Sequence, residues 1–311
     1  MDRVLPSLYM PKKKIAWKLF LAIFSPFIVL LVGLFFWGKE DKFSLDKIRP
    51  KTHFSLQFSQ PNSLKELHEI RDIVSQPYLY LTESKDTYSF VSKDEKYIVK
   101  FFKTRRMTPK YWLNYIPLPW LDGKRLLKIS ERERIRDELF KSLKVSFELY
   151  RYQTGLVFLH LFRTNYLRIK MCVKDQNGVS HYVPLDEIPF VVQRKMTMLF
   201  DYINRLIKKG KEEKAVHSLC HILGLVKEGC THGFIDLSDQ IGDKYGFIGG
   251  RPVHVEGSFI FDESYKNSFM TLKEVFRVSR ILERWVEENQ PALFKRFQTE
   301  VQEILTVLEE E

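Results

Sequence analysis

The stretch YLYLTESKDTYSFVSKDEKYIVKFF, residues 78–102, contains three short runs that are rich in aromatic and β-branched side chains. Two polar turn-forming segments, ESKD at 83–86 and KDEK at 93–96, separate these runs. Runs of this composition between turn signals predict three consecutive β-strands. Immediately upstream, SLKE at 63–66 has the pattern of a capping box and predicts a helix that ends near Ser75.

Downstream of this stretch the pattern changes from mostly strands to mostly helices. Apolar residues at helical spacing predict a helix over 130–153, and an Asn-Gly turn at 177–178 predicts a hairpin. The same signals predict strands at 156–161 and 190–192, a helical region over 196–230, strands within 233–261 and a C-terminal helical region split at Pro291. This order predicts an α+β fold with a small β-rich lobe and a larger helical lobe.

The composition excludes several classes of protein. The chain has 311 residues, of which 44% are hydrophobic and 29% charged, and this balance excludes a disordered chain. Its three cysteines, Cys172, Cys220 and Cys230, are too few for a disulfide scaffold, and their spacings match no zinc-binding pattern. The net charge is +11, and the twelve cations and three acids from Lys96 to Arg136 concentrate positive charge in one stretch.

One segment near the N-terminus is strongly apolar. Residues 19–37, LFLAIFSPFIVLLVGLFFW, contain no charged side chain. A helix of this length spans a bilayer core of about 30 Å, so the segment predicts a transmembrane anchor over 15–37. A cleaved signal peptide is the alternative, but the apolar core is too long and no small-residue cleavage pattern follows it.

The anchor divides the chain and makes a single-pass membrane protein the expectation, with residues 15–37 in contact with the lipid bilayer. Free cysteines fit a reducing compartment, so the remainder is expected to face the cytoplasm. Five parts are predicted: a basic flank at 1–14, the anchor at 15–37, a linker at 38–60, a small β-rich lobe with one long helix at 61–195, and a mainly helical lobe at 196–311.

Lys100 is a candidate binding residue. It lies in YIVKFF, where Ile98, Lys100 and Phe102 share one face of the predicted strand. A lysine between apolar neighbours needs an anionic partner, because burial of an unpaired ammonium is costly. The alternative is an edge-strand lysine whose amine reaches water.

With this lysine, the order of elements resembles the protein-kinase-like fold, nearest the aminoglycoside-phosphotransferase-like branch. The resemblance covers roughly residues 76–290. It implies that Lys100 binds the phosphates of ATP and pairs with an acid of the helix that follows, either Glu148 or Glu138. Either glutamate is alternatively a solvated side chain on a charged helix.

The segment CTHGFID, residues 230–236, is similar to the start of the catalytic loop in that family. Phe234 stands where the resemblance expects the catalytic aspartate. Asp236 and Asp239 are the candidates to replace it as general base, although neither has the spacing of the family.

Two acids further along match the spacing of the family's metal ligands. Asp243 precedes Glu256 by 13 residues, and a strand, a Gly-Gly turn and a second strand separate them. The resemblance implies that this pair holds Mg²⁺, which prefers oxygen ligands and bridges phosphates. The alternative is a surface hairpin with ordinary flanking acids.

The predicted first hairpin lacks the glycines of a phosphate-covering loop. No glycine occurs between Gly38 and Gly123, and the turn at 83–86 brings carboxylates instead. Backbone amides approach a phosphate closely only where side chains are absent. With Phe234 at the catalytic position, this absence favours a pseudokinase over an active enzyme.

Residues 103–128, KTRRMTPKYWLNYIPLPWLDGKRLLK, alternate cations with tryptophan and tyrosine. This mixture suits the headgroup layer of an anionic membrane. Packing of the aromatic side chains on their own domain is an equal alternative. Single-stranded nucleic acid is a weaker one, because the sequence has no nucleic-acid-binding signature.

Three functions follow from these patterns. The first is a membrane-anchored, divergent kinase-like domain that binds ATP and Mg²⁺ or an unidentified protein partner with little catalysis. The second is an active phosphotransferase on a small molecule, lipid or protein, and the third is a structural membrane protein that recruits partners. Binding of nucleotide and consumption of ATP distinguish the three.

Overall fold

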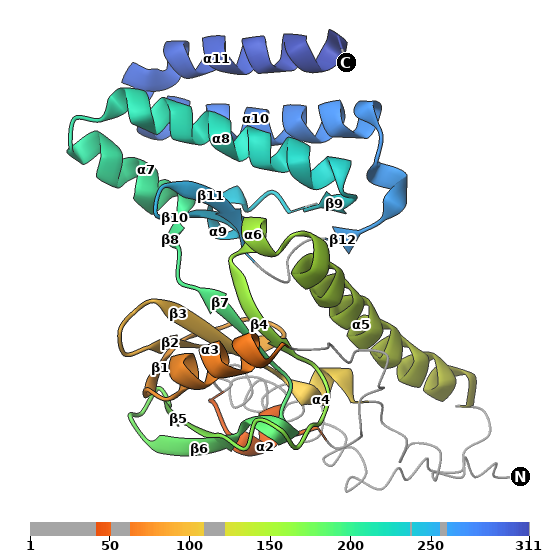
Figure 1. Cartoon of the computed structure of the whole chain (residues 1–311). Coiled ribbons are helices and arrows are strands. Elements are labelled where there is room, and N and C mark those ends of the chain that lie inside the picture. The colour runs from red at the N-terminus through yellow and green to blue at the C-terminus, as the bar shows by residue number, and fades with distance from the viewer. Residues whose placement is uncertain (1–41, 51–62, 109–121, 237, 256–259, 311) are drawn as a thin grey trace, which may run out of the picture. The chain divides into compact units, whose positions relative to one another are not determined.

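The computed structural model describes residues 42–50, 63–108, 122–236, 238–255 and 260–310 (Figure 1). The chain divides into two compact units, Met1–Phe43 and Ser44–Glu311. Nearly all described residues belong to the second unit.

A seven-stranded sheet forms the first half of this unit, in the order β4-β7-β3-β2-β1-β5-β6. Its neighbouring strands are antiparallel except β1 and β5, which pair in parallel. The strands are β1 Tyr78–Glu83, β2 Thr87–Ser92, β3 Tyr97–Phe102, β4 Leu156–His160, β5 Lys170–Lys174, β6 Ser180–Pro184 and β7 Phe190–Arg194.

Short helices and one long helix accompany the sheet. They are α2 Leu45–Ile48, α3 Leu64–Val74, α4 Thr104–Met107, α5 Asp122–Leu149, α6 Arg151–Thr154 and the 3₁₀ turn η4 Leu185–Glu187. The predicted capping box is confirmed at α3, where Ser63 Oγ accepts from the Glu66 amide and the Glu66 carboxylate accepts from the Ser63 amide. The helix predicted over 130–153 starts earlier, at Asp122, and ends at Leu149.

The two faces of the sheet carry different apolar clusters because side chains alternate along a strand. On one face Phe90, Phe101 and Phe190 form a chain of aromatic contacts across β2, β3 and β7, with ring centroids 5.8 and 6.2 Å apart. Phe102 points to the other face, where it packs with Phe140 and other residues of α5.

The second half of the unit is mainly helical. The elements are β8 Thr197–Met198, α7 Leu199–Lys208, α8 Glu212–Thr231, β9 Phe234–Ile235, α9 Ile241–Lys244, β10 Tyr245–Ile248, β11 Arg251–His254, β12 Ile260–Phe261, η5 Glu263–Tyr265, α10 Ser268–Asn289 and α11 Pro291–Glu310. The strands form two small sheets, β11-β10-β8 and β12-β9.

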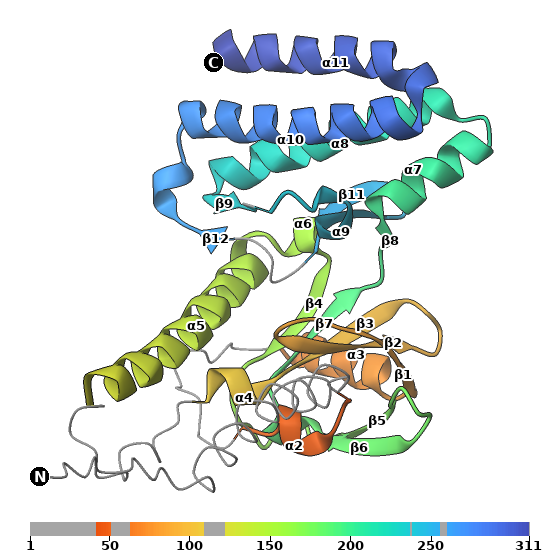
Figure 2. The same cartoon turned by 180° about the vertical axis from the view of Figure 1, so that it is seen from behind.

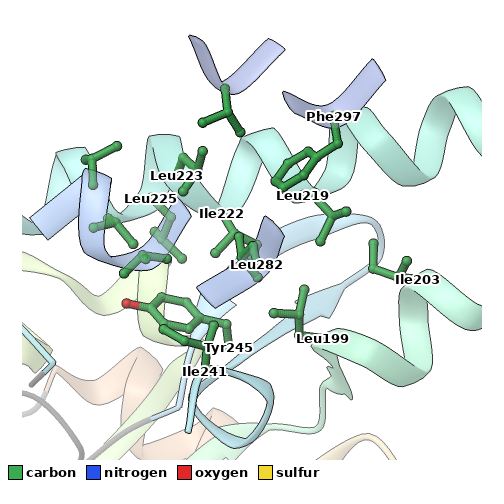
Figure 3. Close-up of a cluster of buried hydrophobic side chains, with 14 of the residues drawn as sticks. Leu199, Ile203, Leu219, Ile222, Leu223, Leu225, Ile241, Tyr245, Leu282 and Phe297 are labelled. Carbon is green, nitrogen blue, oxygen red and sulfur yellow. The ribbon is translucent and has the colours of Figure 1, made fainter. Parts of the chain in front are cut away.

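One large apolar cluster joins these helices. It includes Leu219 and Ile222 of α8, Leu282 of α10 and Phe297 of α11 (Figure 3). Figure 2 shows α8, α10 and α11 side by side, as the cluster requires. The region predicted as helical over 196–230 is two helices, because Gly210 adopts a φ of 65° between α7 and α8 and ends the first one.

The predicted fold class is wrong in its first element, the transmembrane helix. None of the helices among the described residues has the length and apolar composition for crossing a bilayer. The longest, α5, carries charged side chains in every turn, and one such side chain at the bilayer centre costs about 3 kcal/mol. The expected anchor at 15–37 and its flank at 1–14 lie outside the described residues.

The predictions that depended on this anchor are corrected with it. These are the single-pass membrane protein and the domain facing the cytoplasm. The predicted bilayer contact through 15–37 lies outside the described residues and stays a prediction. The structure describes an α+β fold with a curled seven-stranded sheet. The other predicted domain boundaries, at 60 and 195, stay predictions.

Candidate functional site

A cavity of about 810 Å³ lies between the seven-stranded sheet and residues 240–255, and we call it the Lys100 cavity. Its volume falls within the range of about 300–1,000 Å³ that is typical of small-molecule sites. Apolar side chains from β3, α5, β7 and β8 line part of it, among them Ile98, Phe102, Leu143 and Met198. Charged and uncharged polar side chains line the rest, so the cavity suits a molecule with both an apolar and a charged part.

Lys100 reaches the cavity because of its place in β3. That strand lies between β2 and β7, where Lys100 is opposite Ser89 on one side and Val191 on the other. The predicted shared face of Ile98, Lys100 and Phe102 is confirmed, since all three line the cavity. Lys100 is half-buried.

Asp243 reaches the same cavity from α9. The preceding Ile241 is 2% exposed and fixes this short helix in the apolar cluster (Figure 3). A Cβ atom on Gly242 would lie 2.5 Å from the Phe200 ring, so glycine is required for this close approach. The next residue, Lys244, also lines the cavity.

The structure therefore brings Lys100 and Asp243 together, although 142 residues separate them in the sequence. It does not bring Glu148 to the cavity. Leu139 and Leu143, four residues apart on α5, line the cavity, and Phe147 one turn further is buried. Glu148 follows Phe147 and is rotated from it by about 100° on the helix, so its side chain is exposed.

Of the two other predicted acids, the structure describes Glu138 but not Glu256. Glu138 is exposed on α5 and accepts from Arg134 at 2.8 Å. Glu256 lies outside the described residues, so the Asp243–Glu256 pair stays a prediction.

The predicted general-base candidate Asp236 is buried away from the Lys100 cavity. It is 4% exposed, and its carboxylate accepts from the Ser238 amide at 2.9 Å and from His254 Nε2 at 3.2 Å. Burial alone would raise the pKa of Asp236, but the hydrogen bond from His254 and the interaction with its charge outweigh it and lower the pKa. The same burial lowers the pKa of His254.

Arg277 of α10 holds the segment that contains the second candidate, Asp239. Its guanidinium donates to the Asp236 carbonyl at 2.6 Å, to Asp239 Oδ1 at 2.8 Å and to Glu274 Oε1 at 2.7 Å. Glu274 raises the pKa of Arg277 through this hydrogen bond. Among its described lining residues, the Lys100 cavity includes neither Asp236 nor Asp239.

Phe234 occupies the position where the resemblance expects the catalytic aspartate. It is 3% exposed and stacks on Tyr150, with ring centroids 5.0 Å apart. This position faces the apolar cluster of the helices, so an acid there would be buried and far from solvent.

The described residues give no set of ligands for the Mg²⁺ that the resemblance implies. In the part of the chain that the structure describes, no group of three or more His, Cys, Asp or Glu side chains is arranged to hold a metal ion. Of the two predicted ligands, Asp243 lines the cavity, and Glu256 lies beyond the described range.

The basic and aromatic stretch 103–128 is described only at its ends, because 109–121 lie outside the described residues. Lys103 is 8% exposed, donates to Glu83 at 2.9 Å and lies 4.4 Å above the Tyr88 ring. Its ammonium is therefore engaged within the fold. The remainder of the predicted contact with an anionic membrane, and the alternative of nucleic acid, stay untested predictions.

Comparison with known proteins gives no identity. No protein-family model matches the chain, and no curated protein matches it either. The description of the chain as kinase-like or ATP-binding has no support from these comparisons.

The sequence analysis did not predict several residues that line the Lys100 cavity or that contact Asp236. Lys195 and Lys244 line the Lys100 cavity, and His254 and Arg277 hold Asp236. Lys244 follows Asp243 directly, so its place beside a candidate ligand was a usable signal. The partners of Asp236 gave no such signal, because the fold brings them from 18 and 41 residues away.

Proposed function

We propose that this chain is a non-catalytic, divergent relative of the protein-kinase-like fold and that it binds a nucleotide in the Lys100 cavity. The observation that carries the proposal is the convergence of Lys100 and Asp243 on one cavity of about 810 Å³. A nucleotide has a flat, partly apolar base and a charged phosphate, and the cavity offers both kinds of surface.

The place of Lys100 in the fold supports the resemblance. It lies on β3, the third strand of the sheet in chain order, and the long helix α5 and the strand β4 follow it. The resemblance expects the phosphate-binding lysine on a third strand that is followed by a helix and a strand. The lack of a cavity-lining acid on the described part of α5 departs from that pattern and fits a divergent member.

The acids near the expected catalytic position support binding without phosphoryl transfer. A general base must lie within hydrogen-bonding reach of the hydroxyl that it deprotonates. Asp236 is engaged by Ser238 and His254, and Asp239 pairs with Arg277. Phe234 has no proton-accepting group.

The test is a thermal-shift measurement on the full chain with AMP, ADP and ATP, with and without Mg²⁺, together with an assay of ATP consumption. We expect at least one nucleotide to raise the melting temperature, since ligand at about 100 times Kd stabilises a protein by about 2.7 kcal/mol. We expect no ATP consumption above that of the Lys100→Met variant, which should also lose the shift.

Lys174→Met is the matched control, because Lys174 is exposed on β5 and does not line the cavity. It should keep the full shift. A shift that survives Lys100→Met unchanged would contradict the assigned role of the lysine. ATP consumption that depends on Lys100 would favour an active phosphotransferase, and no shift with any nucleotide would favour a structural protein that recruits partners.

A further inference from the structure

The turn between β1 and β2 forms one wall of the Lys100 cavity. Glu83, Ser84, Asp86 and Thr87 all line it. Thr87 is opposite Phe102 and Ser89 is opposite Lys100, so the turn begins roughly 7 Å along the strands from the lysine. A ligand held at Lys100 that extends along β2 reaches this turn.

Three backbone amides at this turn donate hydrogen bonds to acceptors within the turn. The Ser84 amide donates to the Thr87 carbonyl at 2.9 Å. The Asp86 and Thr87 amides both donate to Ser84 Oγ, at 3.3 and 3.1 Å. A phosphate-binding loop presents such amides to its ligand. These three amides are therefore not free for a phosphate.

The turn contains two acids, Glu83 and Asp86, and one lysine, Lys85, so acids outnumber cations in it. Both acids line the cavity, whereas Lys85 is not among its lining residues. Glu83 pairs with Lys103, whose Nζ donates to the Glu83 carboxylate at 2.9 Å and also contacts the Tyr88 ring. Because Lys103 is 8% exposed and held at Glu83, it does not extend into the cavity to offer its ammonium to a phosphate.

We propose that the Lys100 cavity selects a nucleotide that carries a single phosphate over one that carries a phosphate chain. This inference rests on the nucleotide binding proposed above and names the ligand class of the same site. A single phosphate is neutralised at Lys100. Second and third phosphates that extend to the turn meet carboxylates and occupied amides, where a polyphosphate needs free donors.

The test measures the dissociation constants of AMP and ATP for the full chain by calorimetric titration in EDTA. We expect AMP to bind at least about tenfold more tightly than ATP, which corresponds to about 1.4 kcal/mol. Asp86→Asn removes one charge from the turn with little change of shape, so it should tighten ATP binding and leave AMP binding nearly unchanged. Asp72→Asn, on the exposed face of α3, makes the same charge change outside the cavity and should alter neither constant.

The outcomes separate this inference from the proposed function. ATP binding as tight as AMP in the unmodified chain overturns the selectivity and leaves nucleotide binding intact. An AMP-to-ATP ratio that Asp86→Asn does not change also overturns it, because the turn would then not be the cause. Binding of neither nucleotide overturns the proposed function and the selectivity together.

Discussion

Asp236 and Asp243 lie in the same segment after α8, but the fold gives them opposite surroundings. Asp236 lines a small pocket of about 20 Å³, which has room for about one water molecule, whereas Asp243 lines a cavity of about 810 Å³. The first carboxylate is bound by Ser238 and His254. The second has no ion pair with any described residue.

These surroundings determine which of the two carboxylates can contact a bound ligand. A buried carboxylate with its hydrogen bonds satisfied stabilises the fold, and its removal leaves buried donors unpaired. A carboxylate at a cavity of ligand size contributes little to stability and is free to meet a bound molecule.

The largest effect is expected for Phe234→Asp, which places an acid where the resemblance expects the catalytic one. Phe234 is 3% exposed, so the variant removes aromatic packing and buries a charge, and we expect a loss of at least about 4 kcal/mol in the free energy of unfolding. Urea denaturation measures it. Phe269→Asp is the control, because Phe269 is 72% exposed in the first turn of α10.

A Phe234→Asp chain that remained as stable as the unmodified protein and consumed ATP would contradict the burial of position 234 in the core. The position would then face a site and not the core.

A smaller effect is expected for Asp236→Ala. The variant removes the acceptor of His254 Nε2 and of the Ser238 amide, and we expect a loss of about 3 kcal/mol in the free energy of unfolding by urea denaturation. Asp239→Ala removes an acid three residues away whose side chain is 85% exposed, and it should cost at most about 1 kcal/mol. Equal losses for the two variants would remove the distinction between buried and accessible acids.

The sheet carries a buried histidine that should make stability depend on pH. Burial lowers the pKa of His160 to about 4. The hydrogen bond to the Ile188 carbonyl at 3.1 Å acts in the opposite direction and raises the pKa, but by less. The unfolded chain binds a proton at this residue below about pH 6.5, whereas the folded chain does so only below about pH 4. Stability should therefore fall by about 2–3 kcal/mol as the pH decreases through this window.

Urea midpoints measured at several pH values from 7 to about 4 report this dependence. His160→Gln removes the titrating group, so its stability should fall less steeply over the window even if it starts lower. His254 also has a pKa lowered by burial and contributes to the remaining slope. A His160→Gln profile parallel to that of the unmodified chain would show that folding does not lower the pKa of His160.

The smallest effect on stability is expected for Asp243→Asn. The residue lines the Lys100 cavity, so we expect a change within about 0.5 kcal/mol in the free energy of unfolding. Removal of a negative charge from an anion-binding cavity should tighten AMP binding in EDTA by a factor on the order of three. Calorimetric titration measures this, and a loss of stability like that of Asp236→Ala would contradict the contrast.

Local patterns in the sequence predicted the parts of the site that depend on local geometry. Strand alternation placed Lys100 on the face of Ile98 and Phe102, and all three line the cavity. Distance along the chain suggested Glu148 as the partner of Lys100, but the phase of α5, which buries Phe147, leaves Glu148 exposed and outside the cavity lining, so their pairing stays a prediction. The burial of Asp236 depends on β11 and α10, which bring His254 and Arg277 to it, and no local pattern encodes such partners.

The strand pairing in the sheet is likewise only partly predictable from local sequence patterns. Each strand of the first hairpin was predictable from composition and turns. The parallel pairing of β1 with β5, through Tyr78 with Val173 and Leu79 with Lys174, joins segments about 95 residues apart and has no local signal.

The segment between β4 and β7, residues 161–189, is inserted between two strands that are neighbours in the sheet. The chain leaves the sheet at His160, crosses its whole width to add β5 and β6 beyond β1, and returns at Phe190, which pairs directly with His160. Because both ends of this 161–189 segment lie on adjacent strands, a short connection can replace it without a break in the other five strands. The segment is thus an insertion in the connectivity of the sheet but not in its packing, because Met171, Val173, Val183 and Leu185 are fully buried.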